Sequence, residues 1–370
     1  MANDNNGFIS EVLYRLNVGS EINLTLLEKA FDKILNCDNV LARDVQLGAL
    51  LTGIMAKGPK VEEIVTLLKC AFKLDNFLPY DKIKIDLPSN EKLVGAIGSG
   101  KKGFKTMNIS TPAMLLATAA GAYTAKPVSS STSSMTGSAD LLRELGVNID
   151  IPTEKMIKTI KDTGFGAFCI ENLIPKFDNV YGKKFYVPHT LSFGLAALLT
   201  PVHFDNFLYG LAHPDVETSI RVLKEFDIQN AMVVSATNDD IHYLDEMGIY
   251  GTTRLVGIKN GKIGKLIIFR PTEELNLPQY EPHHIAEGDS LKANVQYCVD
   301  VIRGYGEKPR EDIVCINAGT ILYLAEKARD LKDGFNLAKK VIKSGAVLDK
   351  LIEVIHSTGG NKSQLDNYLR

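Results

Sequence analysis

The sequence predicts an α/β protein, in which a small all-helical domain accompanies a large α/β domain whose central sheet is flanked by helices. Three observations predict it. Residues 8–75 show only the apolar spacing of helices, the chain alternates strands with helices from Leu93 onward, and helical stretches close it. With 370 residues, of which 45% are hydrophobic, the chain is long enough for two domains or one large α/β unit.

The all-helical domain is predicted from three stretches near the N-terminus. A capping box, Thr25-Leu26-Leu27-Glu28, begins a helix that reaches Leu35. Residues 41–57 form a second apolar helix that Gly58-Pro59 ends, and residues 61–74 repeat apolar side chains at helical spacing. Because three such helices make only a small core, we expect them to pack on the rest of the chain.

The α/β domain follows a linker over residues 75–90. Its predicted strands are 93–97, 122–128, 166–170, 207–211, 231–234 and a late hairpin of 252–258 with 265–269 around Asn260-Gly261. Its predicted helices are one beginning near Pro112, then 138–145, 153–162, 216–226, 291–303, 312–327 and 334–355, with a frayed end over 359–370. Residues 171–200 are irregular and helical. The predicted helical domain is therefore 1–77 with about 171–200, and the α/β domain is 78–170 with 201–370.

Charge and cysteine usage exclude several classes of protein. A formal net charge of −2 argues against a general nucleic-acid binder. Five cysteines without a Cys-x-x-Cys pair favour a reducing compartment and no zinc cluster. Residues 1–7 are polar, so no signal peptide is evident, and no apolar run approaches the roughly 20 residues that span a bilayer. We therefore expect a cytoplasmic protein that does not contact a membrane.

A glycine-bearing loop follows the first predicted strand. Gly98-Ser99-Gly100-Lys101-Lys102-Gly103 formally matches the dinucleotide fingerprint GxGxxG, but no acidic residue follows at the distance that reads a ribose. Asn108-Ile109-Ser110-Thr111 then precedes Pro112. Pro prefers the first helical position, and Ser or Thr before it can cap the helix. Such a helix start presents N–H donors and a partial positive charge, which suit a phosphate.

The second predicted strand adds further residues that suit a phosphate. It carries Lys126 near its end, and six hydroxyl residues follow it at positions 129–134. Ligands of α/β proteins bind beyond the carboxyl ends of the strands. The sequence therefore predicts a site for a phosphorylated sugar or nucleotide at this edge of the sheet.

At Asn108-Ile109-Ser110-Thr111 and Gly137-Ser138-Ala139-Asp140-Leu141-Leu142 the chain resembles the anthranilate phosphoribosyltransferases, in a glycosyltransferase family shared with the pyrimidine nucleoside phosphorylases. Further matches at family-like spacing are Pro201-x-His203, Pro214-Asp215, Asp245-Glu246, Asn260-Gly261, Asn317-Ala318, Leu322-Tyr323-Leu324-Ala325 and Ser344-Gly345-Ala346. The resemblance covers about residues 10–357. It implies the nucleoside phosphorylase/phosphoribosyltransferase-like fold, a site in the cleft between the two domains, and a homodimer joined through the helical domain.

The resemblance also implies a reaction, the Mg²⁺-dependent pentosyl transfer of tryptophan biosynthesis. A nitrogen acceptor displaces pyrophosphate from 5-phosphoribosyl diphosphate at ribose C1. Because the leaving group gathers negative charge, such a site needs Mg²⁺ and cationic or N–H donors. The matching positions imply Lys126 as the catalytic group beside the pyrophosphate, and Ser110, Asp245 and Glu246 as Mg²⁺ ligands. A gapless alignment offers Asp240 instead of the acidic pair, but we prefer the pair because the following residues then match without gaps.

The loop, the hydroxyl run and the resemblance together give one set of donor- and phosphate-binding residues. They are Gly98, Ser99, Gly100, Lys101, Lys102, Thr106, Asn108, Ile109, Ser110, Thr111, Lys126, Ser129, Ser133, Ser134 and Ser138. Lys101-Lys102 replace a glycine-aspartate of the family, so two ammonium groups stand where the family has a carboxylate. We expect this exchange to alter the diphosphate or metal environment.

The acceptor half departs further from the family. Pro127-Val128-Ser129-Ser130 replaces a His-Gly-Asn-Arg segment, and Lys183 and His189 stand near two family arginines. Ser129, Lys183 and His189 are the predicted acceptor-binding residues. We expect an aromatic or heterocyclic nitrogen acceptor other than anthranilate. The alternatives are a nucleoside phosphorylase-like enzyme, or a non-catalytic member that binds a ligand or partner.

Overall fold

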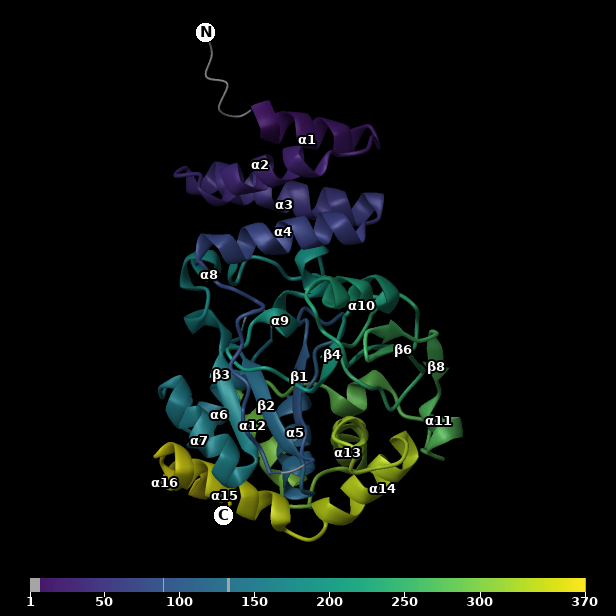
Figure 1. The fold of residues 1–370 in the computed structure, drawn as a ribbon. Coiled ribbons are helices and arrows are strands. Elements are labelled where there is room, and N and C mark those ends of the chain that lie inside the picture. The colour runs from purple at the N-terminus through teal and green to yellow at the C-terminus, as the bar shows by residue number, and fades with distance from the viewer. Residues whose placement is uncertain (1–6, 89, 132–133, 370) are drawn as a thin grey trace.

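The computed structural model describes residues 7–88, 90–131 and 134–369 and has one eight-stranded sheet with helices on both faces (Figure 1). The strands are β1 (Leu93–Gly98), β2 (Tyr123–Val128), β3 (Phe165–Cys169), β4 (Asn206–Gly210), β5 (Ala231–Thr237), β6 (Thr252–Lys259), β7 (Lys262–Ile263) and β8 (Ile267–Phe269). Their order is β3-β2-β1-β4-β5-β6-β7, with β8 also paired to β6. The predicted α/β fold with a central sheet is confirmed.

The first five strands of the sheet are parallel, and β6 is antiparallel to β5. The carboxyl ends of β1 to β5 therefore meet at one edge, where the loops that follow them can form a common site. Parallel strands covered on both faces are continuously apolar, and β1 is buried over Leu93–Ile97 accordingly. In the register of the sheet, Gly98 of β1 lies opposite Gly210 of β4.

Four N-terminal helices stack as a layer at one end of the molecule (Figure 1). They are α1 (Gly7–Asn17), α2 (Leu24–Leu35), α3 (Val40–Lys57) and α4 (Val61–Leu74). Phe31 and Leu50 of this layer share one apolar core with Phe207 of β4. The expectation that the helical segment packs on the rest of the chain is therefore confirmed.

Two details of this layer were wrongly predicted. α1 adds a helix to the three that were expected. α2 is capped by Asn23, whose side chain accepts hydrogen bonds from the N–H groups of Thr25 and Leu26, so Thr25 is inside the helix. The Asn at this position offers its capping oxygen two residues earlier than the Thr-x-x-Glu pattern indicates.

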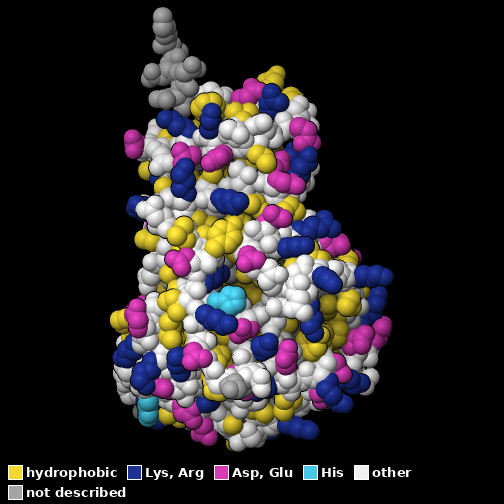
Figure 2. Space-filling model, in the orientation of Figure 1, with side chains coloured by type: hydrophobic (Ala, Val, Ile, Leu, Met, Phe, Trp, Pro, Cys, Tyr) yellow, Lys and Arg dark blue, Asp and Glu magenta, His cyan; other side chains and the backbone are white. Residues whose placement is uncertain are grey.

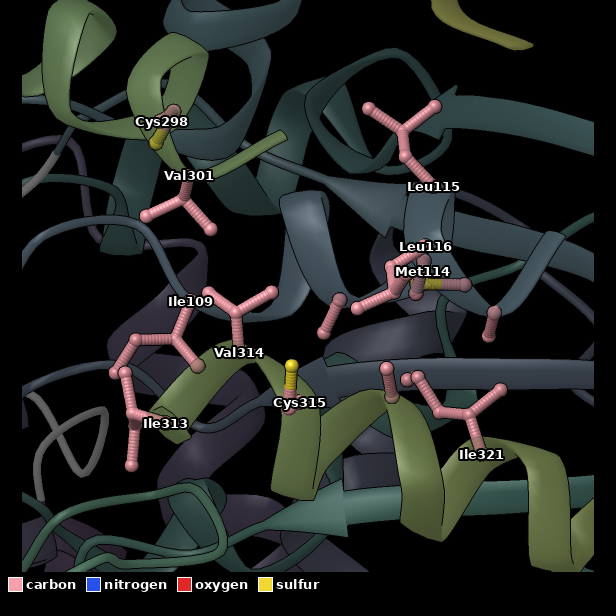
Figure 3. Packing of buried hydrophobic residues seen from close by; sticks show 14 of the residues in the cluster. Ile109, Met114, Leu115, Leu116, Cys298, Val301, Ile313, Val314, Cys315 and Ile321 are labelled. Atoms are coloured by element: carbon pink, nitrogen blue, oxygen red, sulfur yellow. The ribbon is translucent and has the colours of Figure 1, made fainter. Parts of the chain in front are cut away.

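The remaining helices cover the two faces of the sheet. They are α5 (Ser110–Ala119), α6 (Ser138–Glu144), α7 (Thr153–Thr163), α8 (Pro175–Tyr181), α9 (Leu195–Leu198), α10 (Val216–Glu225), α11 (Pro271–Glu274), α12 (Leu291–Ile302), α13 (Lys308–Leu324), α14 (Leu331–Ile342), α15 (Ala346–Thr358) and α16 (Lys362–Asp366), with 3₁₀ turns at Ile170–Asn172, Thr190–Phe193 and Pro282–Ile285. In Figure 3, Met114 and Leu116 of α5 lie above Cys315 and Ile321 of α13. α5 thus packs against α13 as well as against the strands β1 and β2.

The C-terminal region corrects three expectations. The helix predicted over 334–355 is two helices, α14 and α15, because Gly345 has a φ of +82° that a continuous helix excludes. Residues 359–370 were expected to fray, but they contain α16, where Leu365 is fully buried. The hairpin at Asn260-Gly261 forms first between β6 and β7, and β8 pairs farther along β6.

Basic and acidic side chains are interspersed over the face of the molecule in Figure 2, without a field of one sign. Among the described residues, no helix combines the length and apolar character that crossing a bilayer requires. The division into domains at 1–77 with 171–200 and 78–170 with 201–370 stays a prediction.

Candidate active site

A cavity of about 220 Å³ lies where the loops after β1 and β2 meet the start of α5, α8 and the turn that contains Asp245. Sixteen predicted residues line it: Gly98, Ser99, Gly100, Lys101, Lys102, Thr106, Asn108, Ile109, Ser110, Lys126, Ser129, Ser134, Ser138, Lys183, Asp245 and Glu246. Thr111 and His189 are buried outside this lining. Ser133 lies outside the described residues. Asp240, the alternative to the acidic pair, is exposed.

The glycines of the loop make room for the acidic turn, the turn that contains Asp245 and Glu246. A Cβ added at Gly98 would lie 2.2 Å from Asp245 Oδ2, and one added at Gly210 would lie 1.6 Å from the backbone oxygen of Asp245. The Gly100 N–H donates to the same Oδ2 at 2.7 Å. The loop was predicted to approach a phosphate directly. In the structure these contacts bind it to a carboxylate that lies 145 residues further along the chain.

Asn317 of α13 holds the acidic turn from behind. Its Oδ1 accepts from the Met247 N–H at 3.0 Å, and its Nδ2 donates to the Met247 oxygen at 3.0 Å and to the Ile313 oxygen at 2.8 Å. The amide is buried, so all three bonds form away from water. Asn317 was noted in a matching motif but was not predicted to have a role. The signal in the sequence is an amide in an otherwise apolar stretch of helix.

The Lys102 ammonium faces both carboxylates of the turn. Its Nζ lies 3.6 Å from Asp245 Oδ1 and 3.8 Å from Glu246 Oε1, and it donates to Thr106 Oγ1 at 3.0 Å. Burial raises the pKa of Glu246, and the charge of Lys102 opposes the rise. The two lysines of the loop separate, because Lys101 turns the other way, toward Tyr181.

Lys126 lies beneath the start of α5. Its side chain is 1% exposed, and its Nζ donates to Ser110 Oγ at 2.7 Å and to the Ala96 oxygen at 3.3 Å. Burial lowers the pKa of this lysine, and the carboxylates of Glu246 and Asp245 oppose the shift. The ammonium is therefore held by two neutral oxygens and is close enough to the acidic turn to interact with it.

The capping predicted for α5 is wrong. Ser110 and Thr111 are the first two residues of the helix, and Ile109 occupies the cap position without a side-chain hydrogen bond. Pro112 is third instead of first. The Ser110 hydroxyl is thus free of a capping bond and instead accepts from Lys126. Thr111 Oγ1 is buried without a hydrogen-bond partner among the described residues.

Two carboxylates hold the serine-rich loop. The Ser130 N–H donates to Glu171 Oε1 at 2.7 Å, and the N–H groups of Ser131 and Gly137 donate to Asp140 Oδ2 at 2.8 and 2.9 Å. Neither Glu171 nor Asp140 was predicted as a site residue. Because these N–H groups already have protein partners, they are not available as donors to a ligand.

The hydroxyl oxygen of Tyr181 in α8 has two hydrogen-bond partners, which determine what its proton can do. The Leu191 N–H donates to His189 Nδ1 at 3.3 Å, so Nε2 carries the imidazole proton and donates to the Tyr181 oxygen at 2.9 Å. Lys101 Nζ also donates to this oxygen, at 3.1 Å. Burial, with the nearby charge of Lys101, lowers the pKa of His189 well below its usual range, which keeps the ring neutral. The Tyr181 proton is then left for a ligand.

Tyr181 was not predicted from the sequence, and neither was Phe185. The two rings stack with centroids 5.4 Å apart, and both line the cavity. His189, predicted to bind the acceptor, does not line the cavity but hydrogen-bonds to the Tyr181 hydroxyl, which does. Lys183 lines the cavity directly, as a point charge at its rim.

Within residues 7–88, 90–131 and 134–369, no group of three His, Cys, Asp or Glu side chains could hold a metal ion by itself. Asp245 and Glu246 do fit Mg²⁺, which commonly takes one or two carboxylates and completes its six ligands with phosphate oxygens and water. The buried Asp245 Oδ1 has no hydrogen-bond partner within the described part of the chain, so it has a free acceptor site. The donor set therefore fits a metal that arrives with a phosphate.

The chain matches the model of the glycosyl transferase family, a/b domain, over residues 90–348. An anthranilate phosphoribosyltransferase of Paracidovorax citrulli (strain AAC00-1) is 33% identical over 316 residues, covering 85% of this chain and 87% of that protein. One of Thermoanaerobacter sp. (strain X514) is 32% identical over 352 residues, covering 89% of this chain and 98% of that protein.

Solved structures of similar fold extend over nearly the whole chain. Anthranilate phosphoribosyltransferase from Saccharomyces cerevisiae in complex with PRPP and Mg has a TM-score of 0.76 at 20% identity, covering 95% of this chain and 98% of that one. The enzyme from Thermus thermophilus has a TM-score of 0.74 at 22% identity, covering 94% and 99%. At these identities the likeness concerns the fold, and it includes the helical layer.

Proposed function

The chain belongs to the glycosyl transferase family, and from this membership we propose that it is a phosphoribosyltransferase of the anthranilate type, which uses 5-phosphoribosyl diphosphate and Mg²⁺. The relative from Saccharomyces cerevisiae was solved with PRPP and Mg. One observation carries the proposal: a single cavity contains Lys126, Lys102, Ser110 and the pair Asp245–Glu246. This combination of cations, hydroxyls and a carboxylate pair suits a diphosphate with its metal.

We assign the donor to the side of the cavity that contains Lys102, Lys126 and the acidic turn. Lys102 and Lys126 supply the positive charge for the diphosphate, and Asn108 and Ser110 lie at the helix start beside it. Asp245, Glu246 and Ser110 would hold Mg²⁺, which when bound neutralises charge on the diphosphate. The Gly100 bond to Asp245 and the clamp from Asn317 keep the carboxylates oriented before the donor arrives.

The reaction needs positioning more than a strong base. The acceptor nitrogen forms a bond to ribose C1 while the bond from C1 to the diphosphate oxygen breaks, the electron pair leaves with the diphosphate, and the nitrogen releases a proton to solvent. C1 then has oxocarbenium character, so holding the two reactants in line supplies much of the acceleration. The Lys126 ammonium is buried, where its attraction for the developing negative charge is stronger than in water.

We propose that the acceptor is an aromatic or heterocyclic nitrogen compound other than anthranilate. Tyr181 and Phe185 form an aromatic wall that suits a flat ligand, and the Tyr181 proton can bond to an oxygen or ring nitrogen on it. Lys183 and Ser129 also line the cavity, and Lys183 provides a point charge there. A lysine lacks the planar fork with which arginine binds a carboxylate bidentately, which supports an acceptor different from that of the relatives.

A pyrophosphate-release assay with a panel of acceptors tests this function. The panel contains anthranilate, other aminobenzoates, aromatic acids and nucleobases, each with 5-phosphoribosyl diphosphate and Mg²⁺. We expect release with a member other than anthranilate. Anthranilate as the best acceptor would contradict the acceptor proposal. Phosphate-dependent cleavage of nucleosides without any pyrophosphate release would contradict the donor proposal and favour a nucleoside phosphorylase.

Tyr181→Phe is expected to raise the acceptor KM about fivefold, because it deletes one hydrogen bond of about 1 kcal/mol to the acceptor. The donor dissociation constant should stay within about twofold, since Tyr181 is placed on the acceptor side. Tyr186→Phe is the matched control, because Tyr186 is 69% exposed and does not line the cavity. An unchanged acceptor KM in Tyr181→Phe, with the best acceptor from the panel, would show that the hydroxyl does not bind it.

We also propose that the protein acts as a homodimer in the cytoplasm. Large apolar side chains on and beside α1 and α3 are at least half exposed, among them Tyr14, Val18, Leu41 and Val45. Their burial against a second copy would remove apolar surface from water, which favours association. Sedimentation equilibrium should give twice the chain mass, and a monomer at micromolar concentration would contradict this arrangement.

A further inference from the structure

Lys102 is the cation that directly faces the carboxylate pair that we assigned to Mg²⁺. Its Nζ lies 3.6 Å from Asp245 Oδ1 and 3.8 Å from Glu246 Oε1. Both carboxylates are more than nine-tenths buried, and Lys102 is 18% exposed at the cavity wall. Asp245 Oδ1 has no hydrogen-bond partner among the described residues although it is buried, so its charge depends on nearby ammonium groups, of which Lys102 at 3.6 Å forms an ion pair with it.

The two carboxylates of the acidic turn are already matched by ammonium groups without a metal. Lys102 and Lys126 interact with Asp245 and Glu246 in a largely buried space, and Lys105 also interacts with Asp245. A divalent cation alone would add two positive charges to this group, which a buried site tolerates poorly. A divalent cation that enters with a diphosphate brings its own negative charge, so the balance is kept.

We infer that the Lys102 ammonium is the resident counter-ion of the Asp245–Glu246 pair, and that it keeps a divalent cation off the pair until the diphosphate donor enters. The first half of this inference concerns the protein alone, and the second half rests on the proposed function. On donor binding, Lys102 moves to the diphosphate, and the carboxylates become available to the metal that accompanies it. Metal binding is therefore ordered after, or together with, donor binding.

The shape of the loop makes this exchange possible. Lys101 has a φ of +61°, a left-handed conformation that directs consecutive side chains to different sides. Lys101 accordingly bonds to Tyr181 on the acceptor side, while Lys102 turns to Thr106 and the acidic turn. Lys102 lines the cavity with a flexible four-carbon stem, so its ammonium can reach a diphosphate in the same space.

Titration of Mn²⁺ by electron paramagnetic resonance, without donor, tests the first half on the full chain. Wild type is expected to bind Mn²⁺ only weakly. Lys102→Met keeps the stem and removes the charge, and it should bind about one Mn²⁺ per chain at least tenfold more tightly. Adding Asp245→Asn to that variant should abolish the gain. Lys101→Met is the matched control, because Lys101 contacts Tyr181, and it should bind Mn²⁺ as wild type does.

Equal Mn²⁺ affinity in wild type and Lys102→Met would overturn the inference, provided that thermal melting shows both to be folded. Lys102→Gln serves if the methionine variant does not fold. The wild type alone is also decisive, since tight binding of Mn²⁺ without donor would overturn the inference whatever the variants do.

The second half is tested by repeating the wild-type titration with 5-phosphoribosyl diphosphate and subtracting the metal bound by the donor alone. We expect at least tenfold tighter Mn²⁺ binding. If the donor itself does not bind, the proposed function fails, while the donor-free comparison of wild type with Lys102→Met still decides the role of Lys102. If the donor binds but Mn²⁺ affinity does not rise, the ordered exchange is overturned and the donor site stands.

Discussion

Replacing Lys126 with methionine is expected to lower kcat for pyrophosphate release by about 100- to 1,000-fold, the loss typical of removing one preorganised group that stabilises developing charge. The ammonium is 1% exposed and is held by Ser110 Oγ and the Ala96 oxygen, so no water molecule can take its place without rearrangement. Methionine keeps most of the stem, but removing one charge from a buried, interacting group of charges destabilises a protein. We therefore expect a lower melting temperature as well, so kcat is compared at a temperature at which thermal melting shows both proteins to be folded.

Ser110→Ala is the comparison for this experiment. It removes one partner of Lys126 and, in our assignment, one Mg²⁺ ligand, but it leaves the ammonium in place, so we expect a smaller loss than in Lys126→Met. Steady-state rates with the best acceptor of the panel give both values. Activity of Lys126→Met within tenfold of wild type would show that the lysine does not meet the leaving diphosphate.

Gly98→Ala is expected to lower kcat/KM for the donor at least 100-fold. The added Cβ would lie 2.2 Å from Asp245 Oδ2 and 2.6 Å from its Cγ, so the carboxylate must leave its place. Asp245 cannot shift as a whole, because its backbone oxygen is packed against Gly210 and the next turn is clamped by Asn317. A single methyl group on the loop should thus disable the acidic turn.

Gly100→Ala separates this clash from the loss of loop flexibility. A Cβ at Gly100 meets nothing within 4 Å, and its cost is the strain of a φ of +69°, about 1 kcal/mol. We expect a loss of less than about tenfold in the same assay. Equal losses in the two variants would mean that the loop backbone, and not the place of Asp245, limits activity.

The sequence predicted the order of strands and helices because each element depends on its own residues. The apolar run at β1 and the Asn260-Gly261 turn are local signals, and both appear in the structure. The break at Gly345 was missed, since α14 and α15 share one uninterrupted apolar pattern and only the φ of +82° separates them. The cap at Asn23 was missed because two capping patterns overlap within a few residues.

The site was harder to predict, because its contacts join distant parts of the chain. Gly98 was predicted as a glycine of a phosphate-binding loop. In the structure a side chain at this position would clash with Asp245, and no local pattern in the sequence indicates this contact. Lys101 and Lys102 are adjacent in sequence and were assigned to one role, whereas their ammonium groups contact Tyr181 and the acidic turn respectively. His189 was predicted to bind the acceptor, and in the structure its imidazole lies outside the cavity lining and bonds to the hydroxyl of Tyr181, a contact that the sequence does not indicate.

Calorimetric titration of 5-phosphoribosyl diphosphate into the protein, with and without Mg²⁺, is the most direct test, because every role assigned to the cavity depends on donor binding. We expect saturable binding in the micromolar range with Mg²⁺, and weaker binding both without the metal and in Lys126→Met. This result would place the diphosphate beside the lysines and the acidic turn, and would justify the search for the acceptor. Absence of binding in both conditions would contradict the phosphoribosyltransferase assignment.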